Sequence, residues 1–202
     1  IAAIVDAEHN DFHKEKRGMF GFFESVDDQA VANALFDAAK AWFGQRGIVE
    51  LRGPANPSQN HTWGLLVDGF DSKPTFMMTY NKPYYENLIL GYGFFKSQDL
   101  FSFKGHVDML ETLDPKLQFV VDEAKRRFKV KVRRISKKNF EADVKHFLRI
   151  YNAALPGQWG FTPMTEGEMQ ETAAGLKYLM VPELTTMAEI DGEPVAAVFG
   201  LL

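Results

Sequence analysis

The sequence predicts an α/β protein with two tandem mixed sheets, each flanked by helices and each incomplete within this chain. In the first half, apolar strand-like runs alternate with one strong helical pattern, an order typical of a sheet covered by helices. A second series of strand, helices and hairpin begins near residue 130. The 18 Phe residues gather in runs such as 19–23, which indicates buried sheet.

The composition is that of a globular protein with a substantial core, because 46% of the residues are hydrophobic and 25% are charged. The chain has no cysteine, which excludes disulfides, thiolate zinc sites and a cysteine nucleophile and fits a reducing compartment. No apolar run approaches the roughly 20 residues that span a bilayer, so we expect a cytoplasmic protein. A net charge of −4 argues against nucleic-acid binding.

The first part should contain buried strands at residues 1–6 and 18–25, with a polar loop at 8–13 between them. His9 and His13 stand four apart in this loop, but no third ligand is evident, and we expect no metal site. A helix should begin at Asp27-Asp28, since acids suit a helix N-terminus, and end at Gly47. A strand at 48–51 follows.

Residues 58–79 form a long aromatic connection rich in breakers, a kind of segment that is often a lid or a binding loop. Asn81-Lys82-Pro83 should cap a helix that ends at 91–93, and 94–103 should form a closing strand or hairpin. The first domain should comprise residues 1–104, and a connecting segment with a helix should follow at 105–129.

The second domain, 130–202, should begin with a strand at 130–135, followed by a helix from Phe140. Thr165 and Glu168 form a capping-box pattern before a helix at 166–177. Asp191-Gly192 joins two strands and is a strong hairpin signal. The last strand, 194–202, is apolar almost throughout and is therefore expected to be central. Because nothing flanks this strand, and because residues 1–5 look like a strand entered in the middle, we expect the chain to be cut inside a domain at both ends.

The order of elements resembles the GNAT acyltransferases, with the closing half of one fold followed by the opening half of another. Longer runs resemble the tandem-GNAT group related to bacterial ceramide synthase. These runs are Gly21-Phe22-Phe23-Glu24, Arg52-Gly53-Pro54-Ala55-Asn56-Pro57-Ser58, residues 64–71, 77–85 and 150–152, and Trp159-Gly160-Phe161-Thr162-Pro163.

The resemblance implies an N-acyltransferase that moves an acyl group from an acyl-CoA thioester to an amine, with sphingoid or other lipid-like bases among the acceptors. The family binds the diphosphate of CoA through Arg/Gln-x-x-Gly-x-Gly/Ala, where backbone amides approach the phosphates. Here residues 27–32 read Asp-Asp-Gln-Ala-Val-Ala, and two carboxylates would repel a diphosphate. The cofactor-binding residues thus stay unassigned. CoA could bind the second domain beyond Leu202, or the chain could be a GNAT-like binding or scaffolding module without chemistry.

The resemblance also implies site residues. Glu24, after the Phe-rich strand, stands where the family keeps a general base, although an ordinary exposed Glu is the alternative. The family's tyrosine proton donor falls on Leu88; Tyr84 and Tyr85 lie one turn earlier, and Tyr85 is the candidate.

The connection at 56–80 offers amide, aromatic and acidic groups that suit a polar headgroup, with Phe and Met for an acyl chain. The alternative is a lid over its own small core. The candidate substrate-binding residues are Asn56, Asn60, Trp63, Asp68, Tyr80, Asn81 and Tyr84.

Nine Lys or Arg and no acid lie between Lys125 and Lys138. A solvated helix face that runs into an edge strand explains this pattern. The alternative is a surface for anionic lipid or phosphates, which would place the protein peripherally at the inner membrane.

Overall fold

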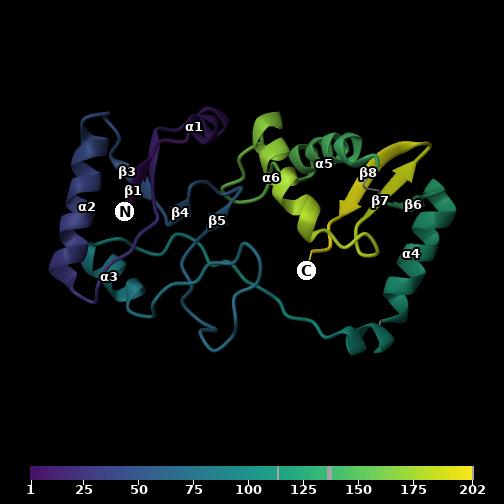
Figure 1. Cartoon of the computed structure of the whole chain (residues 1–202), viewed down its shortest axis with the longest axis horizontal. Coiled ribbons are helices and arrows are strands. Elements are labelled where there is room, and N and C mark those ends of the chain that lie inside the picture. Colours follow the sequence, from purple (N-terminus) through teal and green to yellow (C-terminus); the bar gives the residue numbers. More distant parts are fainter. Residues whose placement is uncertain (113, 136–137, 202) are drawn as a thin grey trace. The chain divides into compact units, whose positions relative to one another are not determined.

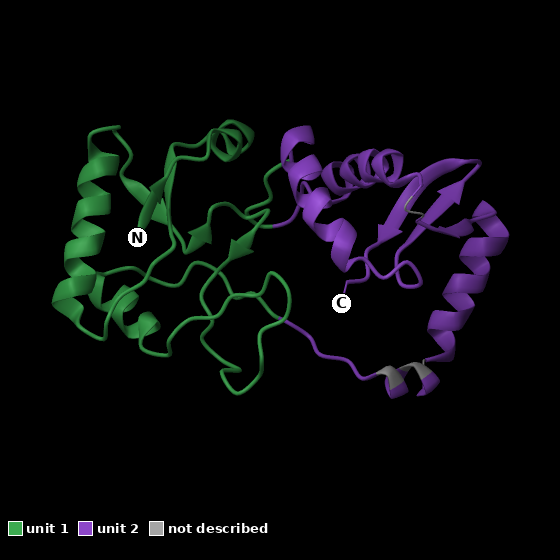
Figure 2. Ribbon diagram, viewed as in Figure 1, with its two compact units in different colours: residues 1–101, 159–163 green, residues 102–158, 164–202 purple. Residues whose placement is uncertain are grey.

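The computed structural model describes residues 1–112, 114–135 and 138–201, and these divide into two compact units. Unit 1 comprises residues 1–101 and 159–163, and unit 2 comprises 102–158 and 164–202 (Figure 2). Both units combine helices with a small sheet, so the protein belongs to the α/β class (Figure 1). Within the described ranges, no helix has the length and apolar character needed to cross a membrane.

The sheet of unit 1 has the order β1-β2-β3. β2 (Arg17–Gly21) pairs antiparallel with β1 (Ala2–Ile4) and parallel with β3 (Glu50–Arg52). α2 (Gln29–Gly44) crosses between β2 and β3 and buries Ala32, Phe36, Ala39 and Phe43. The predicted strand–helix–strand order is confirmed, with shorter strands than the apolar runs suggested.

The polar loop expected at 8–13 is wrong, because α1 (Ala7–His13) occupies these residues. The Asp6 side chain accepts a hydrogen bond from the His9 amide at 2.9 Å and caps the helix. His9 is fully buried, so its side chain is the one that this helix turns toward the core. Seven residues with a histidine at the core position are too few to give a recognisable apolar period.

The core of unit 1 is aromatic. Phe36 of α2 packs edge-on against Phe20, with ring centroids 5.4 Å apart, and stacks on Phe23 at 4.9 Å. α3 (Tyr85–Tyr92) completes this core with Tyr85 and Leu88. The Phe-rich run 19–23 therefore points partly into a buried core, as predicted, although Phe22 is exposed.

A short hairpin lies inside the long connection: β4 (Ala55–Asn56) pairs antiparallel with β5 (Thr62–Trp63). β4 crosses close to β2, since a Cβ on Gly21 would overlap the carbonyl group of Ala55. α3 starts at Tyr85 and not at the predicted Asn81 cap, because the Asn81 side chain is bonded to the backbone of Leu66 and Lys82.

The helix end at 91–93 is confirmed by Gly93, the C-cap, which has a left-handed φ of 107°. The strand expected at 94–103 is wrong, because these residues form neither helix nor strand. Phe94 packs on the core, whereas Phe95, Phe101 and Phe103 are exposed. Apolar alternation alone predicted a strand, but no described strand lies beside this segment to pair with it.

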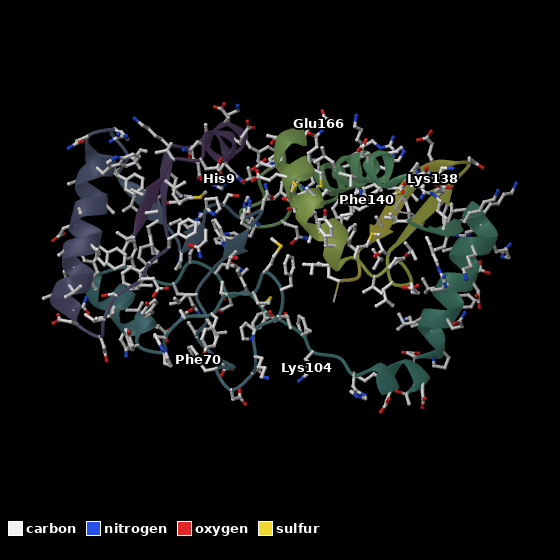
Figure 3. The ribbon with its side chains drawn as sticks, viewed as in Figure 1. His9, Phe70, Lys104, Lys138, Phe140 and Glu166 are labelled. Carbon is white, nitrogen blue, oxygen red and sulfur yellow. The ribbon has the colours of Figure 1, made fainter. Side chains whose placement is uncertain are left out.

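Unit 2 contains an antiparallel sheet of β6 (Lys131–Arg134), β7 (Thr186–Ile190) and β8 (Glu193–Val198), in that order. α5 (Phe140–Ala154) and α6 (Glu166–Leu179) pack with it around Phe140, Met164 and Met187; Phe140 and Glu166 mark the starts of the two helices in Figure 3. The capping box of α6 and the Asp191-Gly192 turn, with φ of 50° and 86°, are confirmed.

Among the named strands of the described residues, β8 pairs with β7 alone, and the prediction that this strand is central in a larger sheet stays a prediction. Val195 and Val198 are accordingly exposed. Leu202, the last residue of the predicted strand, lies outside the described residues.

The remaining helices of unit 2 are a 3-10 turn, η1 (Val107–Thr112), and α4 (Pro115–Phe128). The Asp114 side chain caps α4 by accepting a hydrogen bond from the Lys116 amide, and α4 confirms the helix predicted in the connecting segment.

Candidate functional site

A pocket of about 190 Å³ opens in unit 1 where the chain leaves β2. β2 supplies the residues just after its end, the β4–β5 hairpin supplies a second wall, and the segment before α3 supplies the third. A smaller pocket of about 110 Å³ shares Glu24, Tyr80, Asn81 and Tyr85 with it. The main pocket is lined by Phe22, Phe23, Glu24, Pro54, Asn56, Thr62, Gly64, Leu65, Thr79, Tyr80, Asn81 and Tyr85.

Glu24 and Tyr85 form a hydrogen-bonded pair in this pocket. The Tyr85 hydroxyl donates to Glu24 Oε2 at 2.5 Å and accepts from the Ser25 amide at 3.2 Å. The Tyr85 ring packs edge-on against buried Phe23, 5.1 Å away. Burial, followed by the hydrogen bond to Glu24, raises the pKa of Tyr85, so the phenol stays protonated near neutral pH.

Glu24 itself is exposed, so a ligand in the pocket can reach its carboxylate. Phe23 anchors the neighbouring backbone in the core, and Tyr85 restrains one carboxylate oxygen. The pair therefore combines a reachable anionic group with a fixed orientation, which suits a cationic or hydrogen-bond-donating ligand.

Asn56 shapes the backbone of the pocket at Phe22. The Phe22 amide donates to Asn56 Oδ1 at 2.6 Å, and Phe22 has a left-handed φ of 47°. Such a conformation is unfavourable for a bulky side chain and persists only where surrounding contacts hold it. Because Oδ1 is engaged, Nδ2 is the group with which Asn56 can donate to a ligand.

Two further predicted residues line the pocket in different ways. Tyr80 is 60% exposed at its rim. Asn81 accepts from the Leu66 amide at 2.8 Å and donates to the carbonyl groups of Leu66 and Lys82. Asn81 thus braces the backbone around the pocket, and its polar atoms are occupied by the protein.

The other predicted residues lie away from the pocket lining. The Tyr84 hydroxyl donates to the Ser25 carbonyl at 2.9 Å, Asn60 is buried within the hairpin turn, and Asp68 is exposed. Trp63 packs against Trp159. The sequence reasoning missed Phe22, Thr62, Leu65 and Thr79; the β4–β5 pairing that brings Thr62 to Asn56 has no periodic signal in so short a hairpin.

The N-terminus of α2 is occupied by its own cap. The Asp28 side chain accepts hydrogen bonds from the amides of Ala30 and Val31, at 2.7 and 3.3 Å. The prediction that the helix begins at Asp27-Asp28 is thus confirmed, and a diphosphate would have to displace the Asp28 carboxylate from these amides. Across the described residues there is no cluster of three or more metal-ligating side chains.

The basic stretch from Lys125 to Lys138 divides between two elements. Arg126 pairs with Glu123 on α4, and Arg133 of β6 bridges Asp143 and Glu189 at 2.6 Å each. These hydrogen bonds raise the pKa of Arg133. Because Asp143 is buried, Arg133 serves as the partner of a buried carboxylate. Lys137 lies outside the described residues.

Comparison with known proteins gives two relatives. The chain is 34% identical to protein YghO of Escherichia coli over 202 residues, which is 100% of this chain and 51% of that protein. It is 36% identical to a bacterial ceramide synthase of Caulobacter vibrioides over 187 residues, 90% of this chain and 46% of that protein.

The chain thus spans about half the length of the curated relatives that it matches. The relative named bacterial ceramide synthase is consistent with the tandem-GNAT group that the sequence motifs resemble. No protein-family model matches the chain, and no solved structure gives a significant match.

Proposed function

We propose that unit 1 carries the acceptor site of an N-acyltransferase that moves an acyl group from an acyl-CoA-type thioester to an amine, with a sphingoid or other lipid-like base as acceptor. The observation that carries the proposal is the Glu24–Tyr85 pair in a pocket with both polar and apolar walls. The similarity to a protein named bacterial ceramide synthase supports the same reaction class.

In the proposed reaction, Glu24 takes a proton from the acceptor ammonium group. The neutral nitrogen then attacks the thioester carbonyl carbon, a C–N bond forms, and the C–S bond breaks. The nitrogen loses its second proton to the departing thiolate, which leaves as the free thiol, and Glu24 releases its own proton to solvent. General base catalysis by a positioned carboxylate contributes about 10²–10⁴-fold to such a rate.

Tyr85 is best assigned as a positioning residue for Glu24. Its hydroxyl is engaged with that carboxylate, and its raised pKa keeps the donated proton on the phenol. The pocket walls explain acceptor choice: Asn56, Thr62 and Thr79 can bond hydroxyl groups near the amine, whereas Phe22 and Leu65 offer apolar surface to a hydrocarbon chain.

The donor is not assigned to α2, because Asp28 already occupies its first-turn amides. A GNAT-like binding module without chemistry would also have Asp28 bonded to these amides. The relative named bacterial ceramide synthase does not favour that alternative. Release of free thiol discriminates between the two functions.

The experiment mixes the protein with palmitoyl-CoA and sphinganine and follows thiol release together with the mass of the amide product. Glu24→Gln should lower kcat/KM by about 10²–10⁴-fold, and Tyr85→Phe should lower it less. Glu8→Gln, at an exposed residue of α1 outside the pocket lining, is the matched control. Amine-dependent thiol release that is unaffected by Glu24→Gln would refute the assignment.

We also propose that α4 contacts an anionic lipid surface. Leu117, Val121 and Phe128 repeat at intervals of four and seven along α4 and are about half exposed, and Lys125 and Arg127 flank this line. An apolar face flanked by cations is typical of helices that lie in a membrane interface, where a lipid-like acceptor would also reside.

A further inference from the structure

Residues Trp159–Pro163, here named the strap, connect α5 to α6 in sequence but pack as part of unit 1 (Figure 2). Phe161 and Thr162 are each only 2% exposed. The strap is therefore packed like a core element, although it has no regular secondary structure. The catalytic proposal above gives it no role.

One end of the strap is held by α1. The His13 ring, through Nε2, bonds the Phe161 carbonyl at 2.7 Å, and His9 Nδ1 lies 2.8 Å from the Thr162 hydroxyl. His9 is fully buried in α1 (Figure 3) and bonds Glu15 through its other ring nitrogen. The Phe161 ring also packs edge-on against Phe12, 5.6 Å away.

The other end of the strap is held by the β4–β5 hairpin. Gln59, in the hairpin turn, donates through Nε2 to the Trp159 carbonyl at 3.1 Å. The Trp159 ring lies edge-on to Trp63 of β5 at 6.1 Å and beneath the Arg52 guanidinium at 4.8 Å. Gly160 has a φ of 71°, and a Cβ there would approach Gln59 Oε1 to 3.0 Å, so the chain passes very close to the hairpin turn.

The same hairpin supplies pocket residues from its other side. Successive side chains of a strand point to opposite faces, so Trp63 meets the strap while its neighbour Thr62 lines the pocket. No strap residue lines the pocket. Across the hairpin, Asn56 accepts the hydrogen bond that holds the left-handed Phe22 backbone.

We infer that the strap is a positioning element of the pocket: it supports the hairpin from behind and so fixes Asn56 against the Phe22 amide. The identity of the ligand rests on the proposed function, but the positioning role does not. The Phe22 amide reports it without a ligand, because its hydrogen bond to Asn56 forms only when the hairpin is in place.

The test is amide hydrogen exchange of the whole chain, read at Phe22 by NMR. Trp159→Ala should speed exchange at Phe22 about tenfold relative to wild type, through more frequent local opening of the hairpin. Buried amides of α2 should keep their protection. Asn56→Ala, which removes the acceptor, sets the upper limit. Trp42→Ala is the matched control, since Trp42 also stacks with an arginine, Arg46, but lies on α2 away from the hairpin.

Gln59→Met serves as a milder second variant if Trp159→Ala does not fold, and it should speed exchange at Phe22 a few-fold through loss of one hydrogen bond. Unchanged exchange at Phe22 in a folded strap variant, or equal acceleration in Trp42→Ala, would overturn the inference.

Sphinganine binding to the same variants separates the two proposals. Faster exchange at Phe22 with weaker sphinganine binding supports both. Faster exchange in a chain whose wild-type form binds no sphinganine supports the strap and refutes the assigned acceptor.

Discussion

Asp28 should contribute more to the stability of α2 than its neighbour Asp27, although both carboxylates stand at the same helix end. Asp28→Ala removes two hydrogen bonds, to the amides of Ala30 and Val31. Loss of an N-cap costs about 0.5–2 kcal/mol, and loss of the favourable charge at the helix dipole adds about 0.3–1 kcal/mol. Because Asp28 is exposed, we expect a total near 1 kcal/mol.

Native-state hydrogen exchange at the buried amides of α2 measures this loss, since a chain of two units need not unfold in one step. A loss of about 1 kcal/mol corresponds to roughly fivefold faster exchange. Asp27→Ala is the matched control, because it removes only the dipole interaction. For this exposed residue that interaction should lie near the lower end of its range, about 0.3 kcal/mol, so exchange should change less than twofold. Equal effects of the two substitutions would show that the cap is not the cause, and the argument would fail.

The same carboxylates should oppose a diphosphate at this helix end. Combining Asp28→Ala with Asp27→Arg frees two amides and reverses one charge, so the double variant should gain CoA affinity that isothermal titration can measure. Binding of CoA at micromolar concentration by the unmodified α2 terminus would refute the exclusion and make unit 1 the donor site.

Two further predictions concern charge. Burial lowers the pKa of His9 below its ordinary 6.5, although the hydrogen bond that its ring makes to the Glu15 carboxylate opposes this shift. The unfolded chain then binds a proton that the folded chain does not. The free energy of unfolding of unit 1 should fall as the pH drops through 6.5 toward the lowered pKa, and His9→Gln should flatten that fall. For α4, Lys125→Glu should weaken binding to phosphatidylglycerol vesicles about fivefold, whereas Lys40→Glu on α2 should not; equal binding to phosphatidylcholine vesicles would contradict the electrostatic part.

The long periodic elements of the fold could be predicted from the sequence. α2 has apolar residues at helical spacing and an acidic cap, and the Asp191-Gly192 turn has the two residues that a left-handed turn requires. α1 could not be predicted, because its buried residue is His9, whose core position depends on Thr162, distant in sequence. The strand expected at 94–103 failed for a related reason: pairing needs a neighbour, and apolar alternation does not supply one.

The candidate site likewise contains residues that the sequence could predict and residues that it could not. Glu24 and Tyr85 were assigned from a family pattern, and the structure places them in contact. Sequence could not reveal that Asn81 is consumed by backbone hydrogen bonds, because its partner Leu66 lies across an irregular loop. Nor could the sequence reveal that Trp63 faces the strap, since β4 and β5 are each only two residues long and show no alternating pattern.

The most direct test of the central claim, an amine-binding pocket at Glu24, is an NMR titration of the chain with sphinganine. We expect chemical-shift changes at the amides of Phe22, Glu24 and Tyr85, and about tenfold or more weaker binding in Glu24→Gln, because a charged hydrogen bond is lost. N-acetylsphinganine, which lacks the cation, should bind weakly to both forms. Equal affinity of wild type and Glu24→Gln for sphinganine, or shift changes confined to residues outside the pocket, would show that the amine does not bind at Glu24.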